Sequence, residues 1–260
     1  FRQWLAHLPA SAPPALRLVT IGAEAISGGS VAAWRASPMG ALPLWNTYGP
    51  TEATVTTSAH VTTADDVSAT VVPIGKSLAG RRSIVVGQDG VELPTGGVGE
   101  LCIGGAALAQ GYLAAPALTA ERFVPDASGL PGARLYRTGD RVRRRADGTH
   151  EFLGRLDDQV KLRGHRIELG EIEAALRRCE GVNDAVAVLA GRDESARLVA
   201  YVVGSATSEQ LRGELARVLP TYMVPTAIVP LDAIPLLPNG KRAIAALPSP
   251  ALPTGLGISD

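Results

Sequence analysis

The chain has 260 residues, and its 25 lysine and arginine residues balance its 25 aspartate and glutamate residues, so its formal net charge is zero. Domains typically have roughly 100–200 residues, so this length predicts one large or two modest domains. Zero net charge argues against a nucleic-acid partner or an anionic membrane surface, because both attract basic proteins. No apolar run approaches the roughly 20 residues of a membrane helix, and the first residues do not resemble a signal peptide. We therefore expect a soluble, cytoplasmic protein.

The first part of the chain predicts an α/β arrangement followed by short strands. Residues 16–21 predict a buried strand, a helix containing Trp34 follows, and the β-branched stretch from Val55 to Val61 predicts another strand. Further short strands are predicted at 84–86, 91–93, 101–103, 142–145 and 149–153, with hairpin turns at 88–90 and 146–148. Their number and spacing favour a small barrel-like subdomain.

The pattern changes after residue 157. Residues 168–179 have the spacing of an amphipathic helix, and strands are predicted at 185–189, 198–203 and 227–229. Thr207 with Gln210 predicts a capping box for a second helix, which Pro220 ends. This α-β-β-α-β order is typical of a compact α+β domain. We therefore assign residues 1–156 to an α/β unit with its β-subdomain and residues 157–260 to an α+β domain.

Four segments carry more chemistry than their predicted secondary structure requires. Asn46-Thr47-Tyr48-Gly49-Pro50-Thr51-Glu52 places a ring, a hydroxyl and a carboxylate in one turn, where a ring can stack on a base and a carboxylate can bind Mg²⁺. In Tyr136–Asp140 an acid stands just before a predicted strand, where it could accept hydrogen bonds from a ribose. An ordinary Gly-Pro turn and an ordinary Gly-Asp turn are the simpler interpretations.

The other two segments lie near and after the predicted boundary. Residues 154–173 mix charged residues and glycine densely, and a solvated linker is the simpler interpretation. Pro238-Asn239-Gly240-Lys241 presents a lysine at a turn, for which a water-facing hairpin lysine is the alternative. Lysine is scarce in this chain, with only Lys76, Lys161 and Lys241 present, and it differs from arginine in being a compact point charge on a flexible stem.

Taken in order, six segments resemble those of the adenylate-forming enzymes, most closely the amino-acid-activating adenylation domains of nonribosomal peptide synthetases. The segments are Asn46–Glu52, Gly99–Tyr112, Tyr136–Asp140, Gly154–Glu173, Leu219–Pro225 and Asn239–Lys241. The resemblance implies a ligase that joins a carboxylate to AMP from ATP and then passes the acyl group to a phosphopantetheine thiol. The implied cofactors are ATP and Mg²⁺, and the implied partners are an amino-acid substrate and a carrier domain that bears the phosphopantetheine.

The resemblance also assigns roles to individual residues. It implies that Tyr48 stacks on adenine beside Asn46, that Thr51 touches the α-phosphate, that Glu52 holds Mg²⁺ and that Asp140 accepts from the ribose, with Arg155 nearby. Lys241 would bridge the substrate carboxylate and the phosphate, and Asp157 would be the hinge of a mobile tail domain. Gly22, Ala23 and Glu24 would line the nucleotide pocket. Val19, Ile21, Thr47, Val55 and Thr56 would line part of the amino-acid pocket, and their small, mostly apolar side chains favour a neutral amino acid.

Departures from the family pattern leave alternatives open. The family's phosphate loop and substrate-anchoring aspartate do not occur in these residues, so the resemblance implies the C-terminal part of an adenylation domain. The upstream remainder of the core would then be a further partner, and the isolated chain is expected to lack activity. Arg242-Ala243-Ile244 also replace the residues that usually follow the lysine. An acyl- or aryl-CoA ligase of the same superfamily is the first alternative, and a non-catalytic nucleotide-binding or carrier-docking remnant is the second.

Overall fold

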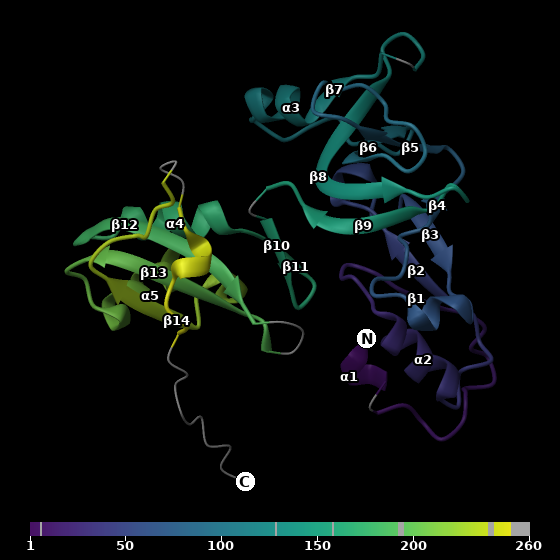
Figure 1. Ribbon diagram of the computed structural model, residues 1–260, viewed down its shortest axis with the longest axis horizontal. Helices are drawn as coiled ribbons and strands as arrows, with labels where there is room; N and C mark the ends of the chain where they lie inside the picture. The colour runs from purple at the N-terminus through teal and green to yellow at the C-terminus, as the bar shows by residue number, and fades with distance from the viewer. Residues whose placement is uncertain (6, 128, 158, 192–194, 239–241, 251–260) are drawn as a thin grey trace. The chain divides into compact units, whose positions relative to one another are not determined.

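The computed structural model describes residues 1–5, 7–127, 129–157, 159–191, 195–238 and 242–250 (Figure 1). The chain divides into two compact units, Phe1–Asp157 and Asp158–Asp260. Within the described part of the chain, no helix combines the length and apolar character needed to cross a membrane.

A β-α-β arrangement opens the first unit and confirms its predicted α/β character. Strand β1 pairs with β2 in parallel, as expected for strands joined through a helix, and β3 and β4 then add in antiparallel fashion. Trp34 on the helix is 1% exposed and packs with Met39 and Leu44. The elements, after the short α1 (Arg2–Leu5), are β1 (Val19–Ile21), α2 (Gly28–Ala36), β2 (Leu44–Tyr48), β3 (Ser58–Val61) and β4 (Lys76–Ser77).

The strand predicted from Val55 to Val61 begins only at Ser58. The chain first makes a 3-10 turn, Thr51–Ala53, after which Thr54 and Val55 adopt φ of 58° and 59°. These left-handed conformations interrupt any strand, and β-branched residues rarely adopt them. Local β propensity was therefore outweighed by the geometry of the turn that carries Glu52.

An antiparallel five-stranded sheet forms the rest of the first unit. The strand order is β5-β6-β8-β7, and β9 also pairs with β8 (Figure 1). The predicted hairpin at 146–148 is confirmed as the β8–β9 connection, whereas the predicted strand at 91–93 is reduced to an isolated bridge between Val86 and Glu92. The elements are β5 (Arg81–Val86), β6 (Val98–Gly105), α3 (Pro116–Arg122), β7 (Phe123–Pro125), β8 (Arg134–Arg144) and β9 (His150–Arg155).

One hydrophobic cluster joins the two sheets of the first unit. Tyr48 from the end of β2 packs with Val85 of β5, Leu101 of β6 and Val142 of β8. This packing brings the Asn46–Glu52 segment, predicted from sequence to carry chemistry, against the sheet that contains Asp140.

The second unit has the predicted α-β-β-α-β order. Strand β12 is antiparallel to β13, which is parallel to β14, and buried residues from α4 and α5 share one core cluster with β12 and β13 (Figure 1). Tyr201 on β13 donates from its hydroxyl to the Pro248 carbonyl at 2.6 Å, which ties the C-terminal segment to the sheet. The elements are α4 (Leu169–Arg177), β12 (Val182–Ala190), β13 (Arg197–Gly204), α5 (Ser208–Val218) and β14 (Ala227–Leu231).

The glycine- and charge-rich run from 154 to 173 is folded rather than a solvated linker. It contains the end of β9, an antiparallel hairpin of β10 (Gln159–Leu162) and β11 (His165–Glu168), and the start of α4. Arg163 and Gly164 connect the hairpin with φ of 52° and 81°, the left-handed pair that a two-residue turn requires. Val160, Leu162 and Ile167 share one face of the hairpin and pack with the core cluster of the second unit. The charged residues Lys161, Arg166 and Glu168 lie on the opposite face.

The capping box predicted for α5 is present. The Thr207 side chain accepts from the Gln210 backbone N–H at 3.3 Å, and the Gln210 side chain accepts from the Thr207 backbone N–H at 3.0 Å. We expect Thr207→Ala to lower the free energy of unfolding of the second unit by about 1 kcal/mol, because the variant leaves a helix N–H without its cap. Urea unfolding followed by circular dichroism measures this loss. Thr207→Ser keeps the acceptor and should cost clearly less, whereas equal losses would contradict the role of the cap.

Candidate functional site

Asp140 lies at an irregularity inside strand β8. The β6–β8 register shifts between the pairs Glu100–Arg141 and Cys102–Arg137, so that residues 138–140 of β8 bulge opposite Leu101. Gly139 adopts φ of 71°, a conformation that favours glycine, and an added Cβ there would lie 2.7 Å from Nη2 of Arg155. The prediction that this acid stands just before a strand is wrong, because β8 runs through it from Arg134 to Arg144. Such bulges re-aim side chains, often beside functional sites.

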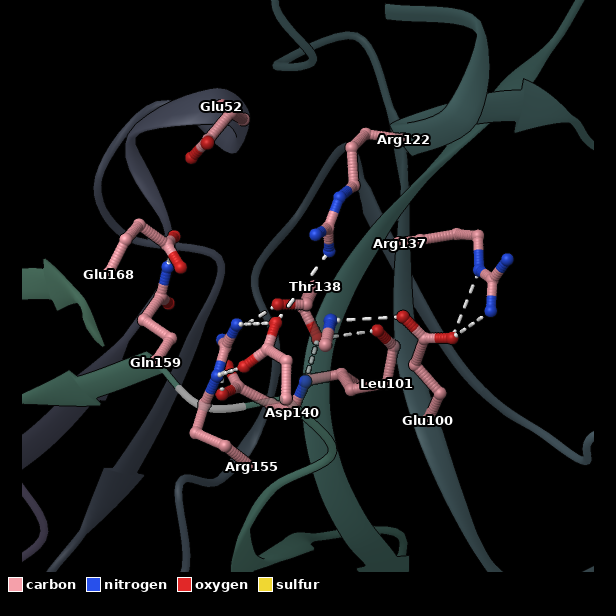
Figure 2. Close-up of polar contacts among 12 residues, drawn as sticks. Glu52, Glu100, Leu101, Arg122, Arg137, Thr138, Asp140, Arg155, Gln159 and Glu168 are labelled. Carbon is pink, nitrogen blue, oxygen red and sulfur yellow. Dashed lines mark hydrogen bonds and ion pairs between the residues drawn. The ribbon is translucent and has the colours of Figure 1, made fainter. Parts of the chain in front are cut away.

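Polar groups on both sides hold the bulge in place (Figure 2). Thr138 donates from its hydroxyl to the Leu101 carbonyl at 2.7 Å and accepts from the Asp140 N–H at 2.9 Å. Glu100, buried with 6% exposure, accepts from the Gly139 N–H at 2.9 Å and from Nη2 of Arg137 at 2.7 Å. The orientation of Asp140 is therefore built into the backbone.

The Asp140 carboxylate receives a hydrogen bond on each oxygen. The Tyr48 hydroxyl donates to Oδ2, and Nη1 of Arg155 donates to Oδ1 at 2.8 Å. Burial, followed by the nearby Asp140 charge, raises the pKa of Tyr48 well above its ordinary value, so its hydroxyl keeps its proton and remains a donor. The Asp140 side chain is only 5% exposed, so Asp140 of β8 and Arg155 at the end of β9 form a buried ion pair (Figure 2). Tyr48 at the end of β2 donates to the same carboxylate.

Arg155 also binds the last residue of the first unit. Its Nε and Nη2 donate to the two carboxylate oxygens of Asp157 at 2.8 and 2.7 Å, and Nη1 of Arg122 lies 3.8 Å from Asp157 Oδ2. This bidentate geometry is the strong form of an arginine–carboxylate pair. One guanidinium group therefore links Asp140 to Asp157, the residue predicted as a hinge.

Glu52 has a separate set of contacts, on a turn apart from the Asp140 group (Figure 2). The Tyr112 hydroxyl donates to Oε1 of Glu52 at 2.8 Å, and the Ala109 N–H donates to the Glu52 carbonyl at 2.8 Å. Burial, then hydrogen bonds with Tyr136 and Glu52, raise the pKa of Tyr112, so it is a donor at neutral pH. The carboxylate predicted to bind metal is therefore held by a tyrosine 60 residues further along the chain.

The other predicted site residues have diverse surroundings. Asn46 is 2% exposed, and its amide donates to the Pro73 carbonyl at 2.8 Å. Thr47 donates to the Ile21 carbonyl at 2.9 Å, which joins the ends of β2 and β1. Val19 and Ile21 are partly buried against the Trp34 cluster, and Thr56 is partly buried. The exposed members are Gly22, Ala23, Glu24, Thr51 and Val55. Lys241 lies outside the described residues.

Family models match both units of the chain. A model described as AMP-binding enzyme covers residues 1–113, and one described as AMP-binding enzyme C-terminal domain covers residues 171–241. The chain belongs to the AMP-binding enzyme family. Asp140 and Arg155 lie between the two matched segments. The resemblance of residues 136–140 and 154–173 implied only that Arg155 lies near Asp140, and the structure shows that the two form an ion pair.

Several curated relatives of this AMP-binding enzyme chain are named as synthases or synthetases. It is 44% identical over 253 residues to tyrocidine synthase 1 from Brevibacillus parabrevis, covering 96% of the chain and 23% of that protein. It is 45% identical over 257 residues to phosphinothricin tripeptide synthetase PhsC from Streptomyces viridochromogenes, covering 96% of the chain and 23% of that protein. The chain thus spans less than a quarter of either relative.

Solved structures of adenylation proteins share the fold. Holo-PA1221, described as a nonribosomal peptide synthetase protein containing adenylation and carrier domains, matches with a TM-score of 0.77 and 37% identity over 90% of this chain and 40% of that one. The Vibrio cholerae adenylation domain AlmE, solved with glycyl-adenosine-5'-phosphate, matches with a TM-score of 0.78 and 30% identity over 90% of this chain and 44% of that one. The predicted combination of a large α/β domain with a smaller C-terminal domain is confirmed by this match.

Three residues that the sequence did not identify as site residues make contacts at the site. Glu100 and Thr138 brace the bulge under Asp140, and Tyr112 binds Glu52. All three lie inside segments that carried the family resemblance, 99–112 and 136–140. Their position in a motif was the available signal, but their partners are far away in sequence.

Proposed function

We propose that this chain is part of an amino-acid adenylation domain of a nonribosomal peptide synthetase. The reaction is formation of aminoacyl-AMP from ATP, followed by transfer of the aminoacyl group to a phosphopantetheine thiol on a carrier domain. The observation that carries the proposal is the match of 90% of the chain to an adenylation domain solved with an aminoacyl adenylate. The five-stranded sheet of β5–β9 would be the barrel-like β-subdomain of that core. Peptide synthase relatives along 96% of the chain support the amino-acid branch.

The geometry of Asp140 supports its proposed role as acceptor for the ribose hydroxyls. A carboxylate offers about four lone-pair positions on its two oxygens. Tyr48 and Arg155 each use one, so acceptor capacity remains for an approaching diol. The guanidinium of Arg155 fixes the direction of the carboxylate through a charge-assisted hydrogen bond. In this proposal Tyr48 faces adenine next to Asn46, with Gly22, Ala23 and Glu24 as neighbouring pocket wall.

Glu52 is suited to Mg²⁺ that arrives with a nucleotide. In nucleotide sites this ion typically keeps several waters and binds one or two carboxylates together with substrate phosphates. Among the residues that the structure describes, no group of three or more histidine, cysteine or acidic residues could hold a metal ion by itself. A single oriented carboxylate fits a metal whose remaining ligands are phosphate and water. When bound, Mg²⁺ neutralises negative charge on the phosphate oxygens, while Thr51 would donate to the α-phosphate.

In the proposed reaction no side chain acts as a nucleophile, because the substrate carboxylate attacks the α-phosphate directly. The chain contributes position and charge: Glu52 and Thr51 on one turn, Asp140 at the ribose, and Lys241 as the cation between the two reactants. Val19, Ile21, Thr47, Val55 and Thr56 would contribute to a pocket for a neutral side chain. The boundary of the compact units falls directly after Asp157, which supports its assignment as the hinge.

Amino-acid-dependent exchange of pyrophosphate into ATP tests this function in the natural chain that contains these residues. We expect exchange with a neutral amino acid from a panel of the common amino acids, and loading of that amino acid onto a holo-carrier domain. Exchange only with carboxylic acids that lack an amino group, together with acyl transfer to coenzyme A, would identify the acyl-CoA ligase alternative. Absence of exchange with every acid would leave the non-catalytic alternative.

A further inference from the structure

Tyr112 is held by an aromatic cluster that fixes the direction of its hydroxyl. Its ring meets Phe123 edge-on, with centroids 5.7 Å apart, and Phe123 in turn lies 5.1 Å from the ring of the fully buried Tyr136. The guanidinium of Arg134 covers Phe123 at 5.3 Å from its centroid. Aromatic contacts of this kind hold ring orientation as well as burying apolar area. The Tyr112 hydroxyl therefore has little freedom to move away from Glu52.

The backbone on either side of Tyr112 is fixed as well. Gly111 adopts φ of 153°, and an added Cβ would lie 2.4 Å from Cγ2 of Thr119. The Thr119 hydroxyl accepts from the Tyr112 N–H at 2.9 Å and donates to the Ala115 carbonyl at 2.9 Å. Only glycine permits this close approach, so the loop before α3 is built to place Tyr112 at one position.

Two further hydrogen bonds join the same loop to the turn that carries Glu52. The Ala109 N–H donates to the Glu52 carbonyl at 2.8 Å, and the Thr54 hydroxyl donates to the Ala107 carbonyl at 2.8 Å. These contacts hold the backbone of the turn. The Tyr112 hydroxyl is the group of this loop that reaches the carboxylate itself, so its role can be separated from the folding of the turn.

We propose that Tyr112 is the positioning residue of the metal-binding carboxylate: its hydroxyl fixes Glu52 in the orientation that binds the Mg²⁺ of the nucleotide complex. This inference rests on the proposed function, in which Glu52 holds that ion. Hydrogen bonds to a ligating carboxylate from residues beyond the metal orient the ligand, and their removal typically lowers metal affinity or activity by about 10–100-fold. An unrestrained carboxylate would instead lose rotational entropy each time it bound the ion.

Tyr112→Phe tests the role because it removes the hydroxyl and leaves the ring in its cluster. The measurement is ATP affinity by isothermal titration calorimetry, in EDTA and across a series of Mg²⁺ concentrations, in the natural chain that contains these residues. We expect the Mg²⁺ concentration that gives half of the Mg²⁺-dependent gain in affinity to rise about tenfold. ATP affinity in EDTA should not change. In the pyrophosphate exchange assay, the half-saturating Mg²⁺ concentration should rise by a similar factor, with exchange recovering at high Mg²⁺.

Tyr136→Phe is the matched control. It removes a hydroxyl 3.4 Å from that of Tyr112 in the same cluster, while the Tyr112–Glu52 bond remains possible. We expect the Mg²⁺ dependence of ATP binding to stay within twofold of that of the unaltered protein. A purely structural role of Tyr112 would lower affinity equally with and without Mg²⁺, and that result would overturn the inference.

A double-mutant cycle with Glu52→Gln identifies the group through which Tyr112 acts. If the hydroxyl works by orienting Glu52, adding Tyr112→Phe to Glu52→Gln should change the Mg²⁺ dependence little further. Independent, additive losses would overturn the inference, as would an unchanged Mg²⁺ dependence in Tyr112→Phe while the unaltered protein retains exchange. Absence of both exchange and Mg²⁺-dependent ATP binding in the unaltered protein would instead overturn the proposed function and this inference with it.

Discussion

Arg155→Met should lower the free energy of unfolding of the first unit by about 3–5 kcal/mol, the usual cost of removing one partner from a buried ion pair. Methionine fills much of the same volume but leaves the Asp140 carboxylate, 5% exposed, without its positive partner. It also releases Asp157 from a bidentate contact. The loss should therefore greatly exceed that of an exposed arginine.

Tryptophan fluorescence during urea unfolding measures this effect in the first unit, because Trp4, Trp34 and Trp45 all precede residue 158. Arg143→Met is the matched control, since the Arg143 side chain is 49% exposed and its Nη1 lies 3.5 Å from Oε2 of Glu151. Exposed pairs of this kind typically contribute about 0–1 kcal/mol. Similar losses in the two variants would show that the Arg155–Asp140 pair contributes no more to the free energy of unfolding than an exposed pair does.

Much of the fold was predictable wherever local pattern and tertiary structure agree. The amphipathic spacing of α4, the capping box of α5 and the β8–β9 hairpin all appear where the sequence places them. Each depends on residues close together in the chain, so local rules suffice. The β10–β11 hairpin is a harder case: its apolar and polar residues do alternate, but each strand has only four residues, too few for the alternation to outweigh the high density of charge and glycine that also suits a solvated linker.

The sequence identified several residues of the candidate site, but it did not predict most of the contacts between them. Motif order identified Asp140, Arg155 and Glu52, but the bulge at residues 138–140 depends on a register shift between β6 and β8. The position of this bulge depends on how two strands that are distant in the sequence pair with each other, so it could not be predicted from residues 138–140 alone. The same limit applies to Tyr112, whose partner Glu52 is 60 residues earlier.

The departure after Lys241 illustrates a different limit. The family pattern gave no partner for Arg242, yet its Nη1 lies 2.9 Å from Oε2 of Glu173 on α4, and the Ala243 N–H donates to the Pro235 carbonyl at 2.8 Å. Arg242, which directly follows Lys241 in the sequence, is therefore anchored to α4 of the second unit. Arg242 departs from the family pattern, but it forms an ion pair with Glu173 that the pattern does not predict.

Lys241→Ala should reduce amino-acid-dependent pyrophosphate exchange by about 10²–10³-fold, the usual effect of removing one preorganised group that stabilises transition-state charge. As the adenylate forms, negative charge builds on the α-phosphate while the attacking carboxylate approaches it. A mobile ammonium can offset both charges at once. The planar guanidinium of Lys241→Arg has a different shape and hydration, so that variant should recover only part of the rate.

Two measurements separate this role from a general loss of function. ATP affinity in the Mg²⁺ titration should fall far less than exchange, because binding precedes the charge development that the lysine stabilises. Transfer from preformed aminoacyl-AMP to the carrier thiol should persist, since that step does not form the adenylate. Lys76→Ala is the control, because Lys76 lies exposed on β4 outside every motif and should leave exchange unchanged. Exchange in Lys241→Ala at the level of the Lys76→Ala control would show that another group supplies the positive charge.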